Sequence, residues 1–291
     1  MEHLVYISEY LIKIDRGKKV ANAIEEAFGK RLEKIPSNSN EWCRDYMPVK
    51  ASDGKLVLFK YMPSYLVGWK SYEKSIPEDQ QAICRSIGLD FEECDVILDG
   101  GAIEIFGTQG IISDRVIKDN CSSWHGDSPT VLGIIKEKLK LKSLIVVPSD
   151  PWDFTGHVDG MVRFIDEKKV VVNDLIGLEN RMKGFSIYEQ ELFRLWKAHF
   201  YNTLKDAELE IEEELPCEVH RNKDDKDATG IYLNFLLLDD VIIMPSYTQY
   251  EASNKKARIK LENLYKRRVI EITANDIAKH GGVINCVTWT N

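Results

Sequence analysis

The chain has 291 residues, of which 44% are hydrophobic and 30% are charged, and its formal net charge is −8. This length suffices for a sizeable core in one large domain or two smaller ones. Charged residues interrupt the first twenty positions, and no apolar stretch approaches the length of a membrane span, which argues against a secretory leader and a transmembrane protein. We therefore expect a soluble cytoplasmic protein. The acidic balance also argues against a nucleic-acid-binding surface.

The order of predicted elements repeats along the chain. A strand at residues 4–12, a helix at 17–29 and a strand at 31–35 open it. Turn residues flanked by apolar runs then mark four β-hairpins, each followed by a helix and a further strand. These units comprise, in order, the hairpins 45–61, 102–113, 158–173 and 230–245, the helices 71–86, 128–139, 187–205 and 251–265, and the strands 95–98, 143–147, 208–213 and 268–272.

The two ends of the chain are expected to pair with each other. Residues 283–290 supply only half a hairpin, and the chain begins with an unpaired strand at Leu4. Pairing the ends closes a ring of five ββαβ-like units with pseudo-fivefold symmetry and leaves no exposed sheet edge. We therefore predict an α/β ring in a single domain over residues 1–291, with an open α+β sheet as the alternative.

Polar side chains recur at one position of this repeat. Asp45 and Asp159 each lie eight residues before a turn residue of their hairpin, and Asp99 lies nine before its own. Asn234 lies five residues before the fourth turn, and Cys286 occupies the matching strand of the fifth unit. Because equivalent positions in a ring converge on its axis, we expect a central pocket. The residues predicted to line it are Asp45, Asp99, His157, Asp159, Asn234 and Cys286.

The residue types in this pocket indicate cysteine chemistry. His157 and Asp159 are expected to share one face of a strand, and a cysteine with a distant histidine is typical of a nucleophile and its acid/base partner. Carboxylates beside Cys286 would oppose the thiolate, unless the ligand brings positive charge. A guanidinium meets this requirement, because its planar N–H donors also match carboxylates. His157 could then protonate the departing nitrogen and later deprotonate water.

Five ordered motifs resemble those of the agmatine deiminase and bacterial-type peptidylarginine deiminase family, within the guanidino-modifying pentein superfamily. The resemblance covers nearly the whole chain. The motifs are residues 42–48 (WCRDYMP), 99–101 (DGG), 156–159 (GHVD) with 163–164 (RF), 232–235 (YLNF) and 281–288 (GGVINCVT).

The resemblance implies a five-bladed α/β propeller that hydrolyses a guanidine to a ureido group and ammonia, without a metal or an organic cofactor. Cys286 would form a covalent thiouronium intermediate, and His157 would be the acid/base. Asp45 and Asp159 would hold the guanidinium nitrogens. Asp99, Asn234, Trp42 and Trp152 are the further substrate-binding candidates. The implied partner is a small-molecule guanidine, with no nucleic acid and no membrane, and a homodimer is left open.

Several positions depart from the family pattern. Asp99 stands where agmatine deiminases have a glutamate, and Asn285 stands where they have a histidine before the nucleophile. Met47 replaces a glycine, and Thr155 replaces an aspartate. These differences bear on the identity of the substrate more than on the reaction, because Cys286 and the other central groups are retained.

Structural roles remain the alternative for each candidate. His157 and Asp159 could be a structural pair, and Cys286 a buried small hydrophobe. Asp45 and Asp99 also fit turn or cap positions. The remaining candidates, Asn234, Trp42 and Trp152, could satisfy backbone groups or pack in the core.

Two further functional classes stay open at this stage. Amidinotransfer would capture the same covalent intermediate with an amine in place of water. A binding protein without turnover, such as a ring resembling the ribosomal anti-association factor, would not need the thiol. Retention of Cys286, His157, Asp45 and Asp159 argues against a ring of the anti-association type. A catalytically inactive guanidine binder stays open, because Asp99 and Asn285 depart from the family pattern.

Overall fold

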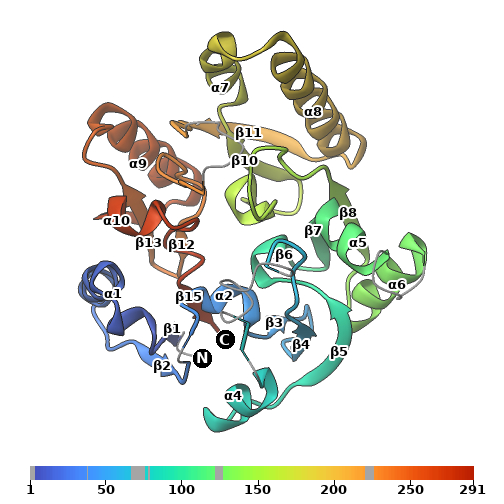
Figure 1. Cartoon of the computed structure of the whole chain (residues 1–291), viewed down its shortest axis with the longest axis vertical. Coiled ribbons are helices and arrows are strands. Elements are labelled where there is room, and N and C mark those ends of the chain that lie inside the picture. The colour runs from blue at the N-terminus through green and yellow to red at the C-terminus, as the bar shows by residue number, and fades with distance from the viewer. Residues whose placement is uncertain (1–3, 38, 67–75, 78, 122–126, 220–225) are drawn as a thin grey trace.

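Five three-stranded sheets surround a common centre in the computed structural model (Figure 1), which describes residues 4–37, 39–66, 76–77, 79–121, 127–219 and 226–291. In every sheet the first strand pairs antiparallel with the second, and the second pairs parallel with the third. The repetition of this order confirms the predicted ring of ββαβ-like units and argues against the open sheet.

Four of the sheets derive from the four predicted hairpins. In each, the strand beyond the helix returns beside the second hairpin strand, as a parallel crossover requires. They are β3 (Val49–Lys50), β4 (Leu56–Lys60) and β5 (Glu92–Ile97); β6 (Ile103–Phe106), β7 (Gln109–Ser113) and β8 (Ser143–Val147); β9 (Val162–Phe164), β10 (Lys169–Asn173) and β11 (Glu210–Leu215); and β12 (Leu236–Leu237), β13 (Val241–Ser246) and β14 (Arg268–Thr273).

The fifth sheet is built from both ends of the chain. Its strands are β15 (Thr288–Thr290), β1 (Val5–Ser8) and β2 (Glu33–Ile35), and β1 pairs antiparallel with β15. Trp289 of β15 is buried, and its Nε1 donates a hydrogen bond to the carbonyl of Pro48 at 2.8 Å, just before β3. The predicted pairing of the termini is therefore confirmed. The hydrogen bond from Trp289 joins this fifth sheet to the sheet of β3, β4 and β5.

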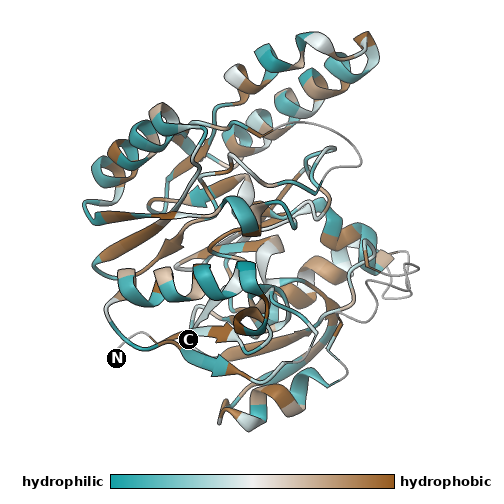
Figure 2. Cartoon of the chain, turned by 60° about the vertical axis from the view of Figure 1, so that its left-hand side comes forward, coloured by the Kyte–Doolittle hydropathy of each residue, from teal (hydrophilic) through white to brown (hydrophobic). Residues whose placement is uncertain are grey.

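Apart from the short α2 at the centre, the helices lie on the outside of the ring (Figure 1) and expose many hydrophilic residues, whereas the strands are largely hydrophobic (Figure 2). A capping box between Ser186 and Glu189 begins the longest of them, as its sequence predicts. Three short helices, α5, α7 and α10, were not predicted. The first part of the predicted helix 71–86 lies outside the described residues. The helices are α1 (Asp15–Phe28), α4 (Gln80–Ser86), α5 (Asp114–Cys121), α6 (Ser128–Lys138), α7 (Leu175–Arg181), α8 (Ile187–Asp206), α9 (Glu251–Tyr265) and α10 (Asn275–Ala278).

Short helical turns stand where strands were expected to begin. They are α2 (Cys43–Tyr46), η2 (Gly100–Ala102) and η3 (Val158–Gly160). Two further turns lie elsewhere: η1 (Leu11–Lys13) at the end of the first predicted strand, and η4 (Met182–Gly184) before α8.

The prediction that His157 and Asp159 share one face of a strand is wrong. His157 caps η3, Asp159 lies within it, and β9 begins only at Val162. The Met161 N–H closes the turn on the Val158 carbonyl at 2.8 Å, so the backbone is satisfied without a neighbouring strand. Glycine within the segment also weakens strand formation.

The other candidates are likewise displaced from strands into the segments before them. Asp45 lies in α2, and Asp99 caps η2. Asn234 precedes β12, and Cys286 lies in a turn before β15. The predicted equivalence of these positions in the repeat is retained, because each stands before the first strand of its sheet.

Arg163 links three neighbouring sheets near the centre of the ring. Its side chain is buried and its Nε donates to Glu104 Oε1 of β6 at 2.9 Å. One terminal nitrogen donates to the carbonyls of Phe235 at 3.0 Å and Leu233 at 3.3 Å, and the guanidinium lies 4.6 Å from the centroid of the Phe235 ring. The planar guanidinium group of arginine carries five N–H donors, so it suits a site with several acceptors in different directions.

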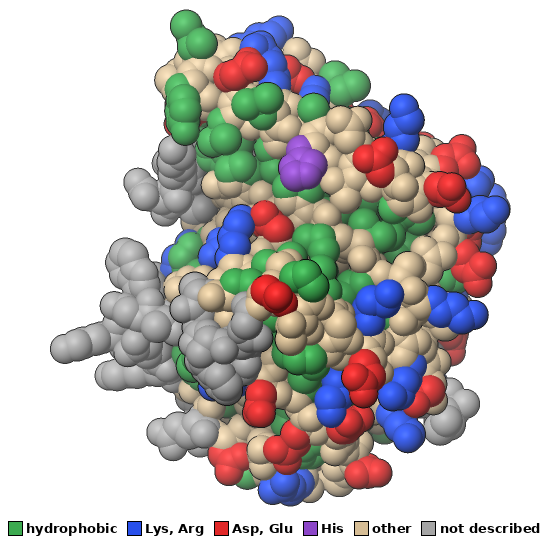
Figure 3. All heavy atoms as spheres, turned by 90° about the vertical axis from the view of Figure 1, so that its right-hand side faces the viewer, with side chains coloured by type: hydrophobic (Ala, Val, Ile, Leu, Met, Phe, Trp, Pro, Cys, Tyr) green, Lys and Arg blue, Asp and Glu red, His purple; other side chains and the backbone are tan. Residues whose placement is uncertain are grey.

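Within the described residues, no helix combines the length and the apolar run needed to cross a bilayer. Figure 3 shows acidic and basic side chains interspersed over one face of the molecule.

We predict that Arg163→Met lowers the free energy of unfolding by about 3–5 kcal/mol, because it leaves the Glu104 carboxylate and two carbonyls without their buried partner. Urea denaturation measures this loss. Arg194→Met is the control, since Arg194 pairs with Glu179 at the surface of α8, and it should change the free energy of unfolding by less than about 0.5 kcal/mol. Equal effects of the two substitutions would contradict the linking role of Arg163.

Candidate active site

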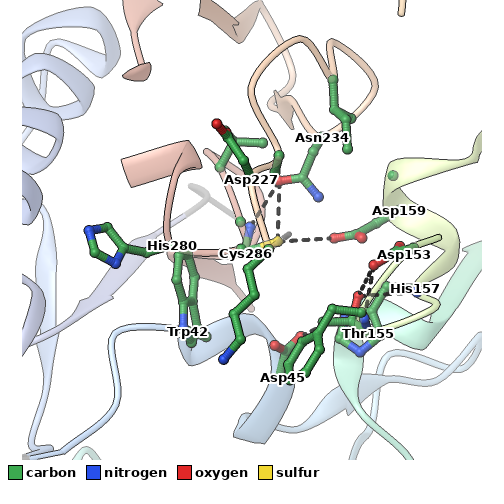
Figure 4. A pocket seen from close by; sticks show the side chains of 18 of the residues that line it. Trp42, Asp45, Asp153, Thr155, His157, Asp159, Asp227, Asn234, His280 and Cys286 are labelled. Carbon is green, nitrogen blue, oxygen red and sulfur yellow. Dashed lines mark hydrogen bonds and ion pairs between the residues drawn. The ribbon is translucent and has the colours of Figure 1, made fainter. Parts of the chain in front are cut away.

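A cavity of about 400 Å³ collects most of the predicted site residues (Figure 4). Its lining includes residues of α2, η3, the segment before β12 and the turn before β15, together with Tyr65 and residues between β8 and β9. Asp99 is not part of the lining and instead contacts His157. The predicted residues that line the cavity are Trp42, Asp45, Trp152, His157, Asp159, Asn234 and Cys286.

Asn234 holds the turn that presents Cys286. Its Oδ1 accepts hydrogen bonds from the backbone N–H groups of Asn285 at 3.1 Å and Cys286 at 3.3 Å. The same oxygen lies 3.3 Å from Cys286 Sγ. Asn234 was predicted as a substrate-binding residue, and these contacts give its oxygen a role in orienting the thiol.

Asp159 lies beside the thiol. One of its carboxylate oxygens, Oδ2, is 3.9 Å from Cys286 Sγ and accepts a hydrogen bond from Asn285 Nδ2 at 2.8 Å. Asn285 appeared in the sequence only as a departure from the family motif. It fixes the carboxylate next to the nucleophile candidate.

His157 lies between two carboxylates. Its Nε2 is 3.0 Å from Asp99 Oδ2, and its Nδ1 is 3.6 Å from Asp45 Oδ1. The N–H of Gly101 donates to that same oxygen of Asp45 at 3.2 Å. A Cβ atom at Gly101 would approach His157 Nδ1 to 2.5 Å and Asp45 Oδ1 to 2.9 Å. Glycine is therefore required for the imidazole and the carboxylate to lie this close.

The two carboxylates keep the imidazole charged. Burial alone would lower the pKa of His157, but Asp45 and Asp99 raise it to about 10. Burial raises the pKa of Asp45 to about 7, although the positive charge of His157 opposes this effect. At neutral pH His157 is consequently an imidazolium, and it can give up a proton to a leaving group.

The surroundings of Cys286 favour the uncharged form of its thiol. Burial raises the pKa of Cys286 well above its ordinary value, and the negative charges of Asp159 and Asp45 raise it further. Cys286 is therefore a protonated thiol unless a cationic ligand lies beside it. A cationic group between the carboxylates would favour the thiolate.

The two tryptophans lie differently. Trp42 forms part of the cavity wall near Cys286: a Cβ atom at Gly282 would come within 2.6 Å of the Trp42 ring and 3.1 Å of Cys286 Cβ. Trp152 is buried, with its ring centroid 5.9 Å from that of Phe193. Trp42 is thus the better placed of the two to contact a ligand, while Trp152 also packs in the core.

Sequence reasoning missed Tyr65, whose hydroxyl donates to Asp99 Oδ2 at 2.8 Å. Its position between predicted elements carried no signal of the repeat.

Among the described residues, no group of three or more His, Cys, Asp or Glu side chains is arranged to hold a metal ion.

A ring of five ββαβ-like units around a central pocket is the pentein fold. The chain belongs to the Porphyromonas-type peptidyl-arginine deiminase family, whose model matches residues 7–291.

Relatives and solved structures agree with this assignment. A Streptococcus mutans protein with the provisional name agmatine deiminase is 22% identical over 73% of this chain, and the match spans 63% of that relative's length. One from Mycoplasma capricolum is 24% identical, over 87% of this chain and 74% of its own.

The agmatine deiminase of Enterococcus faecalis is a structural neighbour with a TM-score of 0.70 at 15% identity, covering 99% of this chain and 92% of that one. The agmatine deiminase of C. jejuni has a TM-score of 0.70 at 16% identity, covering 100% and 97%. At these identities the structures establish the shared fold.

We predict that Asp159→Asn accelerates alkylation of Cys286 by neutral iodoacetamide at pH 8 several-fold, because removing the adjacent negative charge lowers the pKa of the thiol. Mass spectrometry of the Cys286 peptide measures the rate. Cys121, which is exposed, is the internal reference and should react equally in both proteins. An unchanged or slower reaction of Cys286 would show that Asp159 does not control the thiol.

We also predict that Gly101→Ala lowers the pKa of His157 from about 10, because the added methyl group separates the imidazole from Asp45. An NMR titration of the histidine ring protons measures it. Gly133→Ala is the matched control, since a Cβ atom there meets nothing within 4 Å. A His157 titration that is the same in both variants and in the wild type would contradict the close packing at Gly101.

Proposed function

We propose that the protein hydrolyses the guanidino group of a small-molecule substrate to a ureido group and ammonia, with Cys286 as the nucleophile. The observation that carries this proposal is the pairing of a buried thiol with two carboxylates, Asp45 and Asp159, and with the imidazolium of His157 around one cavity. Family membership supports the same reaction class, hydrolysis of C–N bonds in linear amidines.

The carboxylates would bind the substrate cation. Asp159 and Asp45 both line the cavity, and each can accept N–H donors from a planar guanidinium. The positive charge would then oppose the effect of these carboxylates on Cys286 and lower the pKa of the thiol. Binding of the substrate and activation of the Cys286 thiol thus occur together. An uncharged ligand of the same shape would not lower the pKa of the thiol.

The first half of the reaction forms the covalent intermediate. When the cation binds, the Cys286 thiol releases its proton to solvent, where this proton later converts the released ammonia to ammonium. The thiolate then attacks the guanidinium carbon, which gives a neutral tetrahedral adduct with three nitrogens. His157 transfers its proton to an unsubstituted nitrogen, the C–N bond breaks, and ammonia leaves. The nitrogen that is not held by Asp99, Nδ1, is the proton donor. A cationic thiouronium remains on Cys286, stabilised by the same carboxylates.

The second half releases the product. Water takes the place of ammonia, His157 accepts one of its protons, and the hydroxyl adds to the thiouronium carbon. Collapse of this adduct breaks the C–S bond, releases the ureido product and restores Cys286. In total, a guanidinium and water give a ureido group and an ammonium ion.

The relatives named above carry names that refer to agmatine, and the family is named for peptidyl-arginine. For this chain we propose a small cytoplasmic guanidine, acted on by one catalytic domain over residues 1–291. Because the family and the solved neighbours are deiminases, hydrolysis is better supported than amidinotransfer.

We predict that the purified protein releases ammonia and a ureido product from at least one member of a panel of agmatine, free arginine and an arginine-containing peptide. Cys286→Ala should reduce this turnover by at least about 10³-fold, because no other group supplies the nucleophile. Colorimetric ureido detection and an ammonia assay measure the two products. Cys121→Ala is the control, since Cys121 is exposed on α5, and it should retain full activity. Absence of Cys286-dependent turnover on the whole panel would overturn the proposal in favour of a binding protein.

A further inference from the structure

We propose that Tyr65 is a positioning residue for the proposed reaction, whose hydroxyl holds the Asp99 carboxylate against His157. This inference rests on the proposed hydrolysis, and it adds a residue that lies in no recognised motif. Three contacts carry it. The Tyr65 hydroxyl donates to Asp99 Oδ2 at 2.8 Å, the same oxygen lies 3.0 Å from His157 Nε2, and the hydroxyl is 3.5 Å from that nitrogen.

Two donors therefore share one carboxylate oxygen. The other oxygen of Asp99, Oδ1, is buried and has no hydrogen-bond partner among the described residues. Among the described residues, hydrogen bonds therefore orient this carboxyl group through Oδ2 alone. Removal of the hydroxyl would leave His157 as the single donor to this oxygen, and the carboxylate would both lose its orientation and pull more strongly on the imidazole proton.

The Tyr65 ring is itself fixed in place. It packs edge-on against His157, with a centroid separation of 5.9 Å, and against Phe154 at 5.2 Å. The Arg115 guanidinium lies 6.0 Å from the ring centroid. Burial and the charge of Asp99 raise the pKa of Tyr65 well above its ordinary value, so the hydroxyl remains a donor throughout the working pH range.

The proton affinity of His157 determines how well this residue can serve as the general acid of the proposed reaction. A general acid works best when its pKa is near the working pH, and the two neighbouring carboxylates raise the pKa of His157 to about 10. By sharing Asp99, Tyr65 weakens the pull of that carboxylate on the Nε2 proton, and this lowers the affinity of Nδ1 for the proton that is transferred. The charged or titratable groups that act on His157 and Tyr65 are Asp45, Asp99, Asp159, Tyr61 and Arg115.

The test compares Tyr65→Phe with the wild type on the substrate found in the panel. Phe keeps the ring packing and removes only the hydroxyl. We expect kcat to fall about ten-fold or more with KM changed less than about two-fold, and the basic limb of the kcat profile to move to higher pH. Tyr201→Phe is the matched control, because it removes another tyrosine-to-carboxylate bond, to Glu214 Oε1 at 2.8 Å on the outer side of the ring. That control should leave kcat, KM and the profile unchanged.

A double substitution tests whether Tyr65 acts through Asp99. If it does, Tyr65→Phe combined with Asp99→Asn loses no more activity than Asp99→Asn alone. Additive losses, a rise in KM without a fall in kcat, or an unshifted pH profile would each overturn the inference.

Folding and the proposed function are checked separately. If Tyr65→Phe does not fold, replacement of Tyr65 by 3-fluorotyrosine keeps the ring and supplies a stronger donor. The basic limb should then move to lower pH, and an unmoved limb would overturn the inference. Wild-type protein assayed in parallel separates the two proposals: an inactive wild type refutes the hydrolase, whereas an active wild type with an unaffected Tyr65→Phe refutes only the role of Tyr65.

Discussion

Buried negative charge beside a buried thiol is the constraint on which the site depends. Asp159 lies 3.9 Å from Cys286 Sγ, and Asp45 raises the pKa of the same thiol. This arrangement disfavours the thiolate in the free protein, and in the proposed reaction it would become productive only when a cation is bound. The protein would thereby protect its cysteine from neutral electrophiles and reserve reactivity for a guanidinium, so that recognition and activation of the substrate are carried by the same carboxylates.

The ring supplies the geometry that this constraint requires. Carboxylates held this close to a thiol and an imidazole need rigid attachment, and here they come from separate sheets that contact each other near the centre. Arg163 ties three of those sheets together with charge-assisted hydrogen bonds, and the pairing of β1 with β15 closes the ring. Each site residue stands before the first strand of its sheet, where a tight turn directs side chains towards the centre and the strand behind it provides support.

Sequence periodicity was sufficient for the order of the strands and the longer helices, the pairing of the termini and the equivalence of the site positions. It was insufficient for local structure at the site. His157 and Asp159 lie in a turn, because pairing with β10 begins only at Val162, after Gly160. Tyr65 was missed because its contact with Asp99 joins two segments whose spacing follows no repeat. The requirement for glycine at position 101 depends on three-dimensional packing against His157, which a turn motif in the sequence does not convey.

The most direct test of ligand-induced activation compares two alkylating agents of similar size, cationic 2-chloroacetamidine and neutral 2-chloroacetamide. Second-order rate constants for Cys286 at pH 7.5, corrected for the intrinsic reactivity of each reagent towards a free thiol, isolate the effect of charge. The account predicts that the cationic reagent reacts at least about ten-fold faster and that this advantage is reduced in Asp159→Asn. Equal corrected rates, or a preference for the neutral reagent, would contradict it.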